Sequence, residues 1–296
     1  MDCTPLTWSP STADALSPTI IVCSIALVIH ILFWSQVLLF PLLRKRNMMW
    51  LYAYLITDCF LLTRFFILYT LRRENVCLRP TFKTILCYFE ASSKFYMNAV
   101  QTYLLLALNV CRYGQIVLNR NFYRQYPRLI ILTHFLIGFL PAVNVTVQFL
   151  ANLTLLWRRT GASCDILYNS IIVQIFNLFA VYIIPIVLSL VIIALCIHHV
   201  SSIEGIRNQQ IINLRRKYQR MLLYQTIIFY SLWLVLWSPY VLAFQFINVN
   251  TSPGIYTSLI NYVEITIDPI IVAALDIRFL EVWRNILHRR RRVVPT

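Results

Sequence analysis

Three acidic side chains, Asp58, Glu264 and Asp268, lie inside long apolar stretches of this sequence. Glu264 and Asp268 are four residues apart, which places them on one face of a helix. Two carboxylates about 6 Å apart, at an effective dielectric constant of about 20, repel each other by about 3 kcal/mol. The three acids can therefore all be ionised only if something compensates their charge. We expect a site for a sodium ion or a shared proton; the alternative is a protonated, hydrogen-bonded structural cluster.

Glu90 and Lys94 form a second charged pair, again four residues apart on the sequence. A glutamate that precedes a lysine at this spacing favours an ion pair along a helix, and Arg64 is a further candidate partner for the acids. The pair could form part of a ligand-binding site, or the two charges could neutralise each other and only brace the helices. Such a ligand site would also include aromatic and polar side chains at Phe95, Asn98, Tyr240, Phe244 and Tyr262.

Arg112 ends the apolar run QTYLLLALNVCRY at 101–113, and no acidic residue lies beside it. A charged side chain at the centre of a membrane helix costs about 2.5 to 3.5 kcal/mol on insertion scales. Arg112 therefore either extends to the headgroups at the membrane surface or has a functional role.

The elements that must position these residues are apolar helices. The 296-residue chain is 59% hydrophobic and only 12% charged, which is far more apolar than a soluble protein of this size. Its apolar stretches are long enough to cross about 30 Å of hydrocarbon as helices. We predict an all-α membrane protein with an N-terminal segment at 1–17, a seven-transmembrane helix bundle at 18–275 and a tail at 276–296. The predicted spans are 18–43, 48–71, 86–111, 129–150, 171–199, 221–247 and 254–275.

Basic residues gather in the loops after the first and third spans, before the sixth span and in the tail. The positive-inside rule then places the N-terminus outside the cell and the C-terminus inside, although 71–83 and 151–167 also carry some basic residues. Two glycosylation sequons, at Asn152 and Asn250, fall on the outer side, as glycosylation requires. Topology and anionic lipid explain the net charge of +15 better than nucleic-acid binding does.

The tail segment DIRFLEVWRNILHRRRR alternates apolar and basic residues with a helical period. It places Phe279, Val282, Trp283 and Ile286 on one face, which predicts a short amphipathic eighth helix at the membrane surface.

Four cysteines, Cys3, Cys77, Cys87 and Cys164, fall on the predicted outer side, where the environment is oxidising. Linking Cys87 to Cys164 would attach the loop 151–167 to the third span and leave Cys3 and Cys77 as a possible second bridge. Four cysteines allow three connectivities, and the residues alone do not choose among them.

Several motifs in register make the chain similar to the rhodopsin-like G-protein-coupled receptors, over residues 18 to 288. The spacing of 25 residues between Cys87 and Arg112 matches the third span of that family. The other matching positions are Asp58 in the second span, Cys164 in the second outer loop, Pro185 in the fifth span, Trp237-Ser238-Pro239 in the sixth and Asp268-Pro269 in the seventh.

This resemblance implies a role for each matching position. Cys87 and Cys164 would form a disulfide bond, and Asp58 with Gln101 would face the seventh span in a sodium pocket. Arg112 and Tyr113 would form the cytoplasmic switch that meets the G protein when the sixth span swings outward about Pro239. The other positions implied in activation are Trp237, Pro185 and Pro269.

The chain also departs from the family pattern at positions that control activation. The family holds its switch arginine with an acid directly before it and often with another at the base of the sixth span. Here those positions are Cys111 and Gln219, which predicts a weakly restrained inactive state and high basal signalling. Lys94 stands where amine receptors of the family carry an aspartate, so an ammonium ligand is not expected. Further departures are His30, Phe139, Ile193 and Val272.

The functional prediction is a plasma-membrane receptor, not an enzyme, that passes a signal from an extracellular ligand to a heterotrimeric G protein. A small peptide is the expected ligand, with the loop 151–167 as a lid. The alternative is a proton- or sodium-coupled transporter, because intramembrane acids and lysine are common in such proteins. No internal repeat supports the transporter, the seventh span has no lysine for a retinal, and the histidines lack metal-ligand spacing.

Overall fold

The computed structural model describes residues 8–44, 48–74, 78–157, 163–202, 210–246, 251–276 and 278–284. Side chains are described for these residues except positions 11, 210–218, 240–246 and 252. Some predicted site residues lie outside this description: Cys3, Cys77 and Asn250 entirely, and Tyr240 and Phe244 by their side chains.

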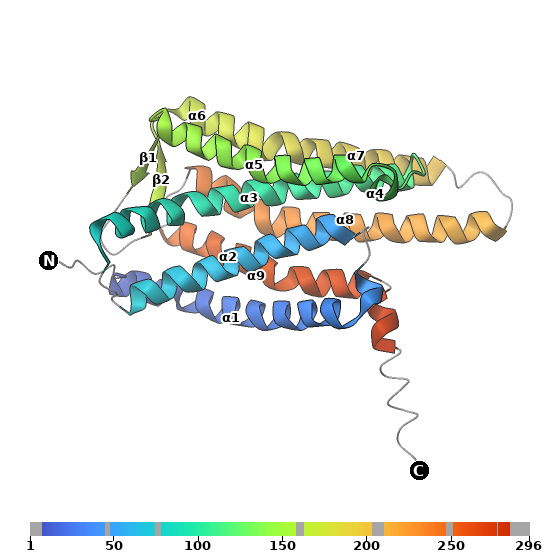
Figure 1. The fold of residues 1–296 in the computed structure, drawn as a ribbon, viewed down its shortest axis with the longest axis horizontal. Coiled ribbons are helices and arrows are strands. Elements are labelled where there is room, and N and C mark those ends of the chain that lie inside the picture. The colour runs from blue at the N-terminus through green and yellow to red at the C-terminus, as the bar shows by residue number, and fades with distance from the viewer. Residues whose placement is uncertain are drawn as a thin grey trace, which may run out of the picture.

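Long helices lie lengthwise beside one another and alternate in direction along the chain (Figure 1). A π-helix, η3, joins α6 to α7 in one continuous segment, and a short α4 precedes α5. The long helices are α1 (Pro10–Leu39), α2 (Met49–Arg73), α3 (Pro80–Ile116), α5 (Pro127–Leu150), α8 (Gln210–Phe246) and α9 (Ser252–Leu275). The continuous segment consists of α6 (Ile171–Asn177), η3 (Leu178–Ile183) and α7 (Ile184–Ser202). The short helical elements are η1 (Pro41–Leu43) and α4 (Phe122–Gln125).

Within the described part of the chain, 6 helices are long and apolar enough to cross a membrane. They correspond to the predicted first, second, fourth, fifth, sixth and seventh spans, and they indicate a multi-pass membrane protein. The predicted third span lies in α3, which has 37 residues but is less apolar because it carries Lys83, Glu90, Lys94 and Arg112.

The start of the first helix differs from the prediction. α1 begins at Pro10 rather than at residue 18, because the Ser9 side chain caps it by accepting a hydrogen bond from the Thr12 backbone N–H at 3.2 Å. Proline at the first helical position is compatible with a helix start, since its missing N–H would have no partner there. Part of the predicted N-terminal segment 1–17 is therefore helical.

The loop between α5 and α6 contains two strands that the all-α prediction missed. β1 (Thr154–Trp157) pairs antiparallel with β2 (Asp165–Tyr168), with Thr154 opposite Tyr168. Cys164 directly precedes β2 and forms a disulfide bond with Cys87 of α3. The predicted Cys87–Cys164 bridge is thus confirmed, and it fixes the hairpin against the N-terminal part of α3.

The segments that connect the helices lie at the two ends of the molecule. The β1–β2 hairpin and the N-terminal end of α1 lie at one end, and α4 with the start of α8 lies at the other (Figure 1). We call these the hairpin end and the α4 end. Three basic residues of the predicted inner loops lie in or beside α4: Arg120 precedes it, Arg124 lies in it, and Arg128 is the second residue of α5, which follows it.

α3 lies at the centre of the packing and contacts α2, α5, α7 and α8. The largest apolar cluster surrounds it and includes Trp50, Tyr54, Phe95, Leu105 and Trp237. Sites along α3 are therefore buried even where its own sequence is polar, which is what positions Glu90, Lys94 and Arg112 inside the protein.

Residues 278–284 form a helical turn after α9, as the amphipathic pattern predicts. Phe279 is buried and stacks on Phe33 of α1, with ring centroids 5.2 Å apart. Trp283 is partly exposed and donates its indole N–H to Gln36 at 2.9 Å. The apolar face of this segment thus packs on α1; Ile286 lies outside the described residues.

Candidate functional site

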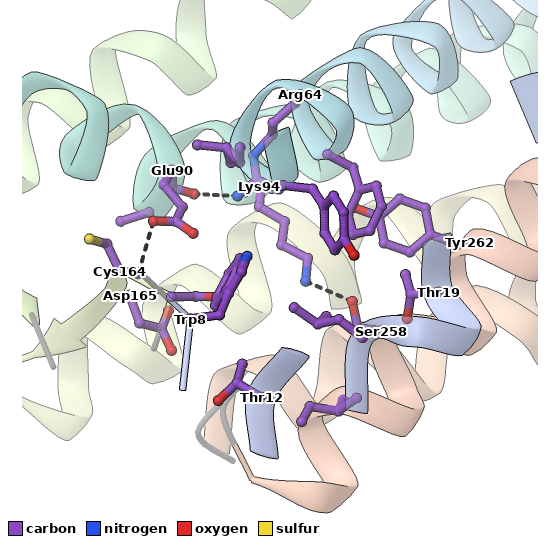
Figure 2. Close-up of a pocket in the computed structure, with 17 residues that line it drawn as sticks. Trp8, Thr12, Thr19, Arg64, Glu90, Lys94, Cys164, Asp165, Ser258 and Tyr262 are labelled. Carbon is purple, nitrogen blue, oxygen red and sulfur yellow. Dashed lines mark hydrogen bonds between the residues drawn. The ribbon is translucent and has the colours of Figure 1, made fainter. Parts of the chain in front are cut away.

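A small cavity lies at the hairpin end, enclosed by α1, α2, α3, β2 and α9 (Figure 2). Its volume is about 80 Å³, which is small compared with the roughly 300 to 1,000 Å³ of pockets for drug-sized ligands. The cavity therefore has room for one side chain or a small polar group. Its charged and hydroxyl-bearing lining includes Arg64, Glu90, Lys94, Asp165, Ser258 and Tyr262.

Glu90 attaches three parts of the protein to one another. Its carboxylate forms an ion pair with Arg72 of α2 and accepts the backbone N–H of Cys164 at 3.1 Å. The Arg72 guanidinium also lies 4.3 Å from the centroid of the Trp8 ring, in a cation–π contact. Together with the disulfide, these contacts hold the hairpin and the segment before α1 over the cavity.

The side chains of Glu90 and Lys94 are not oriented toward each other as the predicted ion pair requires (Figure 2). Figure 2 shows the two side chains pointing apart, with the Lys94 ammonium donating to the Ser258 hydroxyl at 3.2 Å. Arg64, also a predicted partner of the acids, donates to the Ser93 hydroxyl at 2.6 Å and to the main-chain oxygen of Glu90. Lys94 thus extends toward α9, and Arg72 rather than Lys94 forms the ion pair with Glu90.

The other predicted ligand residues are divided between the cavity and the core. Tyr262 lines the cavity. Phe95 and Asn98 are buried deeper along α3 and do not line it. The described contacts identify Arg72, Asp165 and Ser258 as residues of this region that the sequence did not indicate.

The acidic cluster lies in the interior, where Asp58, Glu264 and Asp268 are all buried. The Tyr54 hydroxyl lies 2.5 Å from Glu264 Oε1 and 3.0 Å from Asp268 Oδ2. Gln101 donates to Asp58 Oδ1 at 2.5 Å, so all the predicted members of this site gather in one region. Tyr54 is a member that the sequence reading missed, although it lies one helical turn before Asp58 on the same face.

The hydrogen bonds within this cluster favour a shared proton. A tyrosine hydroxyl has one hydrogen, so it donates fully to only one of the two carboxyl groups that it contacts. A protonated carboxyl can complete the second contact by donating to the Tyr54 oxygen. Among the described residues, no group of three or more His, Cys, Asp or Glu side chains is arranged to hold a metal ion.

Arg112 lies at the α4 end and is buried, with 6% of its surface exposed. Among the described side chains, its guanidinium donates one hydrogen bond, a long one of 3.4 Å to the Gln115 side-chain oxygen. Cys111 accepts the indole N–H of Trp50 at 3.2 Å, and Gln219 donates to the Ile116 carbonyl at 3.1 Å. Cys111 and Gln219, which stand where rhodopsin-like receptors carry acids, thus form hydrogen bonds with groups other than Arg112.

Tyr123 of α4 packs beside Cys111 and Arg112. Burial raises the pKa of its hydroxyl, so this group stays neutral and provides no negative charge for Arg112.

Aromatic rings form a continuous row of contacts in the interior of the bundle. Phe95 lies edge-on to Tyr182, which packs against Trp237 with centroids 5.5 Å apart. Trp237 stacks on Trp233 at 4.4 Å, and Trp233 packs on Tyr230 at 5.3 Å.

The predicted prolines lie inside or beside helical segments that they weaken. Pro239 lies inside α8 and Pro269 lies inside α9, and each removes one helical hydrogen bond because proline has no N–H. Pro185 is buried at the second position of α7, the helix that follows the π-helix. Tyr113, next to Arg112, packs against a small apolar cluster between α3, α7 and α8.

The predicted glycosylation residue Asn152 is exposed at the hairpin end, in a turn with φ of 53° after α5. Its side chain is therefore accessible.

No protein-family model matches this chain, and no curated protein sequence matches it either. The family resemblance therefore rests on the motifs and spacing within the chain itself.

Proposed function

We propose that this protein is a rhodopsin-like receptor of the plasma membrane, with seven transmembrane helices, that couples an extracellular ligand to a heterotrimeric G protein. In this proposal α3 is the third of seven spans, and its helical neighbours shield its charged residues from lipid. The hairpin end faces outward, and the basic α4 end faces the cytoplasm.

The observation that carries the proposal is that α3 contains both the residues that line the cavity and Arg112. One helix holds the disulfide-tethered cavity at its beginning, through Cys87, Glu90 and Lys94, and the buried Arg112 near its end. A ligand that rearranges the cavity would therefore act on the same rigid element that presents the arginine.

The ligand in this proposal is a small peptide. The cavity has room for one of its side chains or a terminus, and the β1–β2 hairpin provides backbone and side-chain surface for the rest. Lys94 and Arg64 near the cavity disfavour an ammonium group there.

The proposed output is an outward movement of α8 about Pro239, which exposes Arg112 to the G protein. The stacked rings Trp237 and Trp233 lie on α8 between the cavity and the α4 end, so their repacking would accompany this movement. Removal of the large Trp237 ring is therefore expected to uncouple ligand binding from signalling.

The test is an assay of G-protein activation in cells that express the full chain. We expect signalling above mock-transfected cells, an increase with active members of a peptide library, and loss of both in Arg112→Ala at equal surface expression. An Arg112→Ala variant that signals as strongly as the wild type would refute the role of the arginine.

The buried acidic cluster favours a second candidate, a proton-coupled transporter. Tyr54 and the three acids could pass a proton between them, as they lie within hydrogen-bonding or electrostatic range. Proton-driven uptake of a substrate by cells expressing the chain, without any G-protein activation, would establish this function instead of the receptor.

A further inference from the structure

A second, smaller cavity surrounds Arg112 at the α4 end. Its volume is about 20 Å³, and its walls come from α2, α3, α8 and α9. Most of the lining is apolar, including Leu51, Leu108 and Phe229, and the polar groups that reach it include Asn109, Arg112 and Gln225.

Three nitrogen atoms at this cavity are hydrogen-bond donors without an acceptor. They are Arg112 Nε, Asn109 Nδ2 and Gln225 Nε2, and each is shielded from solvent and has no partner among the described residues. Asn109 and Gln225 are 2% and 9% exposed. Buried donors are rarely left unpaired in proteins, so three around one cavity indicate an acceptor that belongs there.

The charge of the missing acceptor follows from Arg112. A guanidinium is protonated at every physiological pH, and no carboxylate pairs with Arg112 in the part of the chain that the structure describes. Rotating the Asn109 or Gln225 amide would bring an oxygen toward the cavity, but an amide oxygen carries no net charge. A buried positive charge of this kind is normally paired with a negative one.

The size of the cavity limits the candidates. A single water requires about 10 to 15 Å³ by the same measure, so the cavity holds one small group. A monatomic anion matches this size, whereas phosphate or a nucleotide does not.

We propose that this cavity binds one chloride-sized monovalent anion, held by Arg112, Asn109 and Gln225. The anion provides the negative charge that an acidic side chain would otherwise supply at Cys111 or Gln219. It neutralises the buried charge of Arg112. Because a small ion exchanges with solvent, it restrains the arginine less firmly than a carboxylate attached to the chain would, and its loss leaves the buried charge unpaired.

Thermal unfolding of the purified full chain tests the site independently of any signalling function. Sodium chloride is replaced stepwise by sodium gluconate at constant ionic strength, since gluconate is too large for the cavity. We expect a saturable rise in Tm with chloride, of about 3 to 6 °C at ten times the half-saturating concentration. Equal Tm values in chloride and gluconate would show that the cavity holds only water and would overturn the proposal.

Two variants assign the effect to this cavity. Gln225→Glu places a carboxylate of the same size among the donors, so its Tm is expected to be independent of chloride. Gln125→Glu is the matched control, because it adds the same charge at an exposed position of α4 and is expected to keep the wild-type chloride response. A Gln225→Glu variant that responds to chloride like the wild type would overturn the site.

Bromide supplies direct localisation, since its anomalous scattering is visible in crystals. A single peak within hydrogen-bonding distance of Arg112 is expected in bromide-soaked wild-type crystals. A peak at other positions only would overturn the assignment.

Discussion

Arg72 and Glu90 form an ion pair whose side chains are only 2% and 4% exposed. Removing one partner of such a buried pair leaves the other charge without compensation, which costs about 3 to 5 kcal/mol. We therefore expect Arg72→Met and Glu90→Gln each to lower the free energy of unfolding by about this amount. For a chain of this length the loss corresponds to a Tm lower by about 6 to 20 °C.

The double variant Arg72→Met/Glu90→Gln separates the pair from the other contacts of each residue. Arg72 also contacts Trp8, and Glu90 also accepts the Cys164 N–H, so each single loss contains more than the ion pair. Because neither charge is left unpaired in the double variant, its loss should be smaller than the sum of the single losses by about 2 kcal/mol or more. The assay is thermal unfolding in detergent micelles. Unfolding is monitored through the reaction of buried cysteines with a fluorescent thiol reagent as they become exposed.

The matched control is the ion pair of Arg278 with Asp276 after α9. Its N–O distance is 2.6 Å, and the Arg278 side chain is 18% exposed, so water weakens its contribution. Arg278→Met is expected to lose about 1 kcal/mol or less. Additive losses in the Arg72 and Glu90 cycle, or a loss in Arg72→Met no larger than in Arg278→Met, would refute this reasoning.

Three further substitutions test other contacts by the same unfolding measurement. Gly114→Ala places a Cβ against the Phe122 ring, so the ring or α4 must move, with a loss of about 1 to 3 kcal/mol. A stability equal to wild type would contradict this close approach. Tyr54→Phe removes the hydroxyl shared by two carboxyl groups and should lose about 1 to 3 kcal/mol, and an unchanged Tm would show that this hydroxyl contributes little. Cys87→Ser removes the bridge to Cys164, which spans a sequence separation of 77 residues, and should lower the free energy of unfolding by about 4 kcal/mol. Equal Tm values of the wild type with and without a reducing agent would argue against this contribution of the bridge.

The sequence predicted the long helices and the Cys87–Cys164 bridge because both depend on simple patterns. Apolar runs of spanning length have few alternatives to a helix in a membrane, and the bridge followed from the family spacing. The β1–β2 hairpin was not predicted, since four-residue strands leave little periodicity to detect.

The partner of Glu90 was missed because the second span was predicted to end at residue 71. In the structure α2 continues to Arg73, and this extra length brings Arg72 against Glu90. Similarly, the i, i+4 spacing of Tyr54 and Asp58 is visible in the sequence, but the contact of Tyr54 with α9 depends on how two distant helices pack. The sequence therefore identified the charged residues of each site, while their pairing required the tertiary structure.

We propose that Arg112 acts as a receptor switch, and the level of basal G-protein activation depends on this role. The measurement compares wild type, Cys111→Asp and Arg112→Ala at equal surface expression in cells. The carboxylate introduced by Cys111→Asp would lie next to Arg112 and hold it, so we predict high basal activation in the wild type, lower activation in Cys111→Asp and none in Arg112→Ala. Wild-type activation no greater than that of Cys111→Asp would contradict the account.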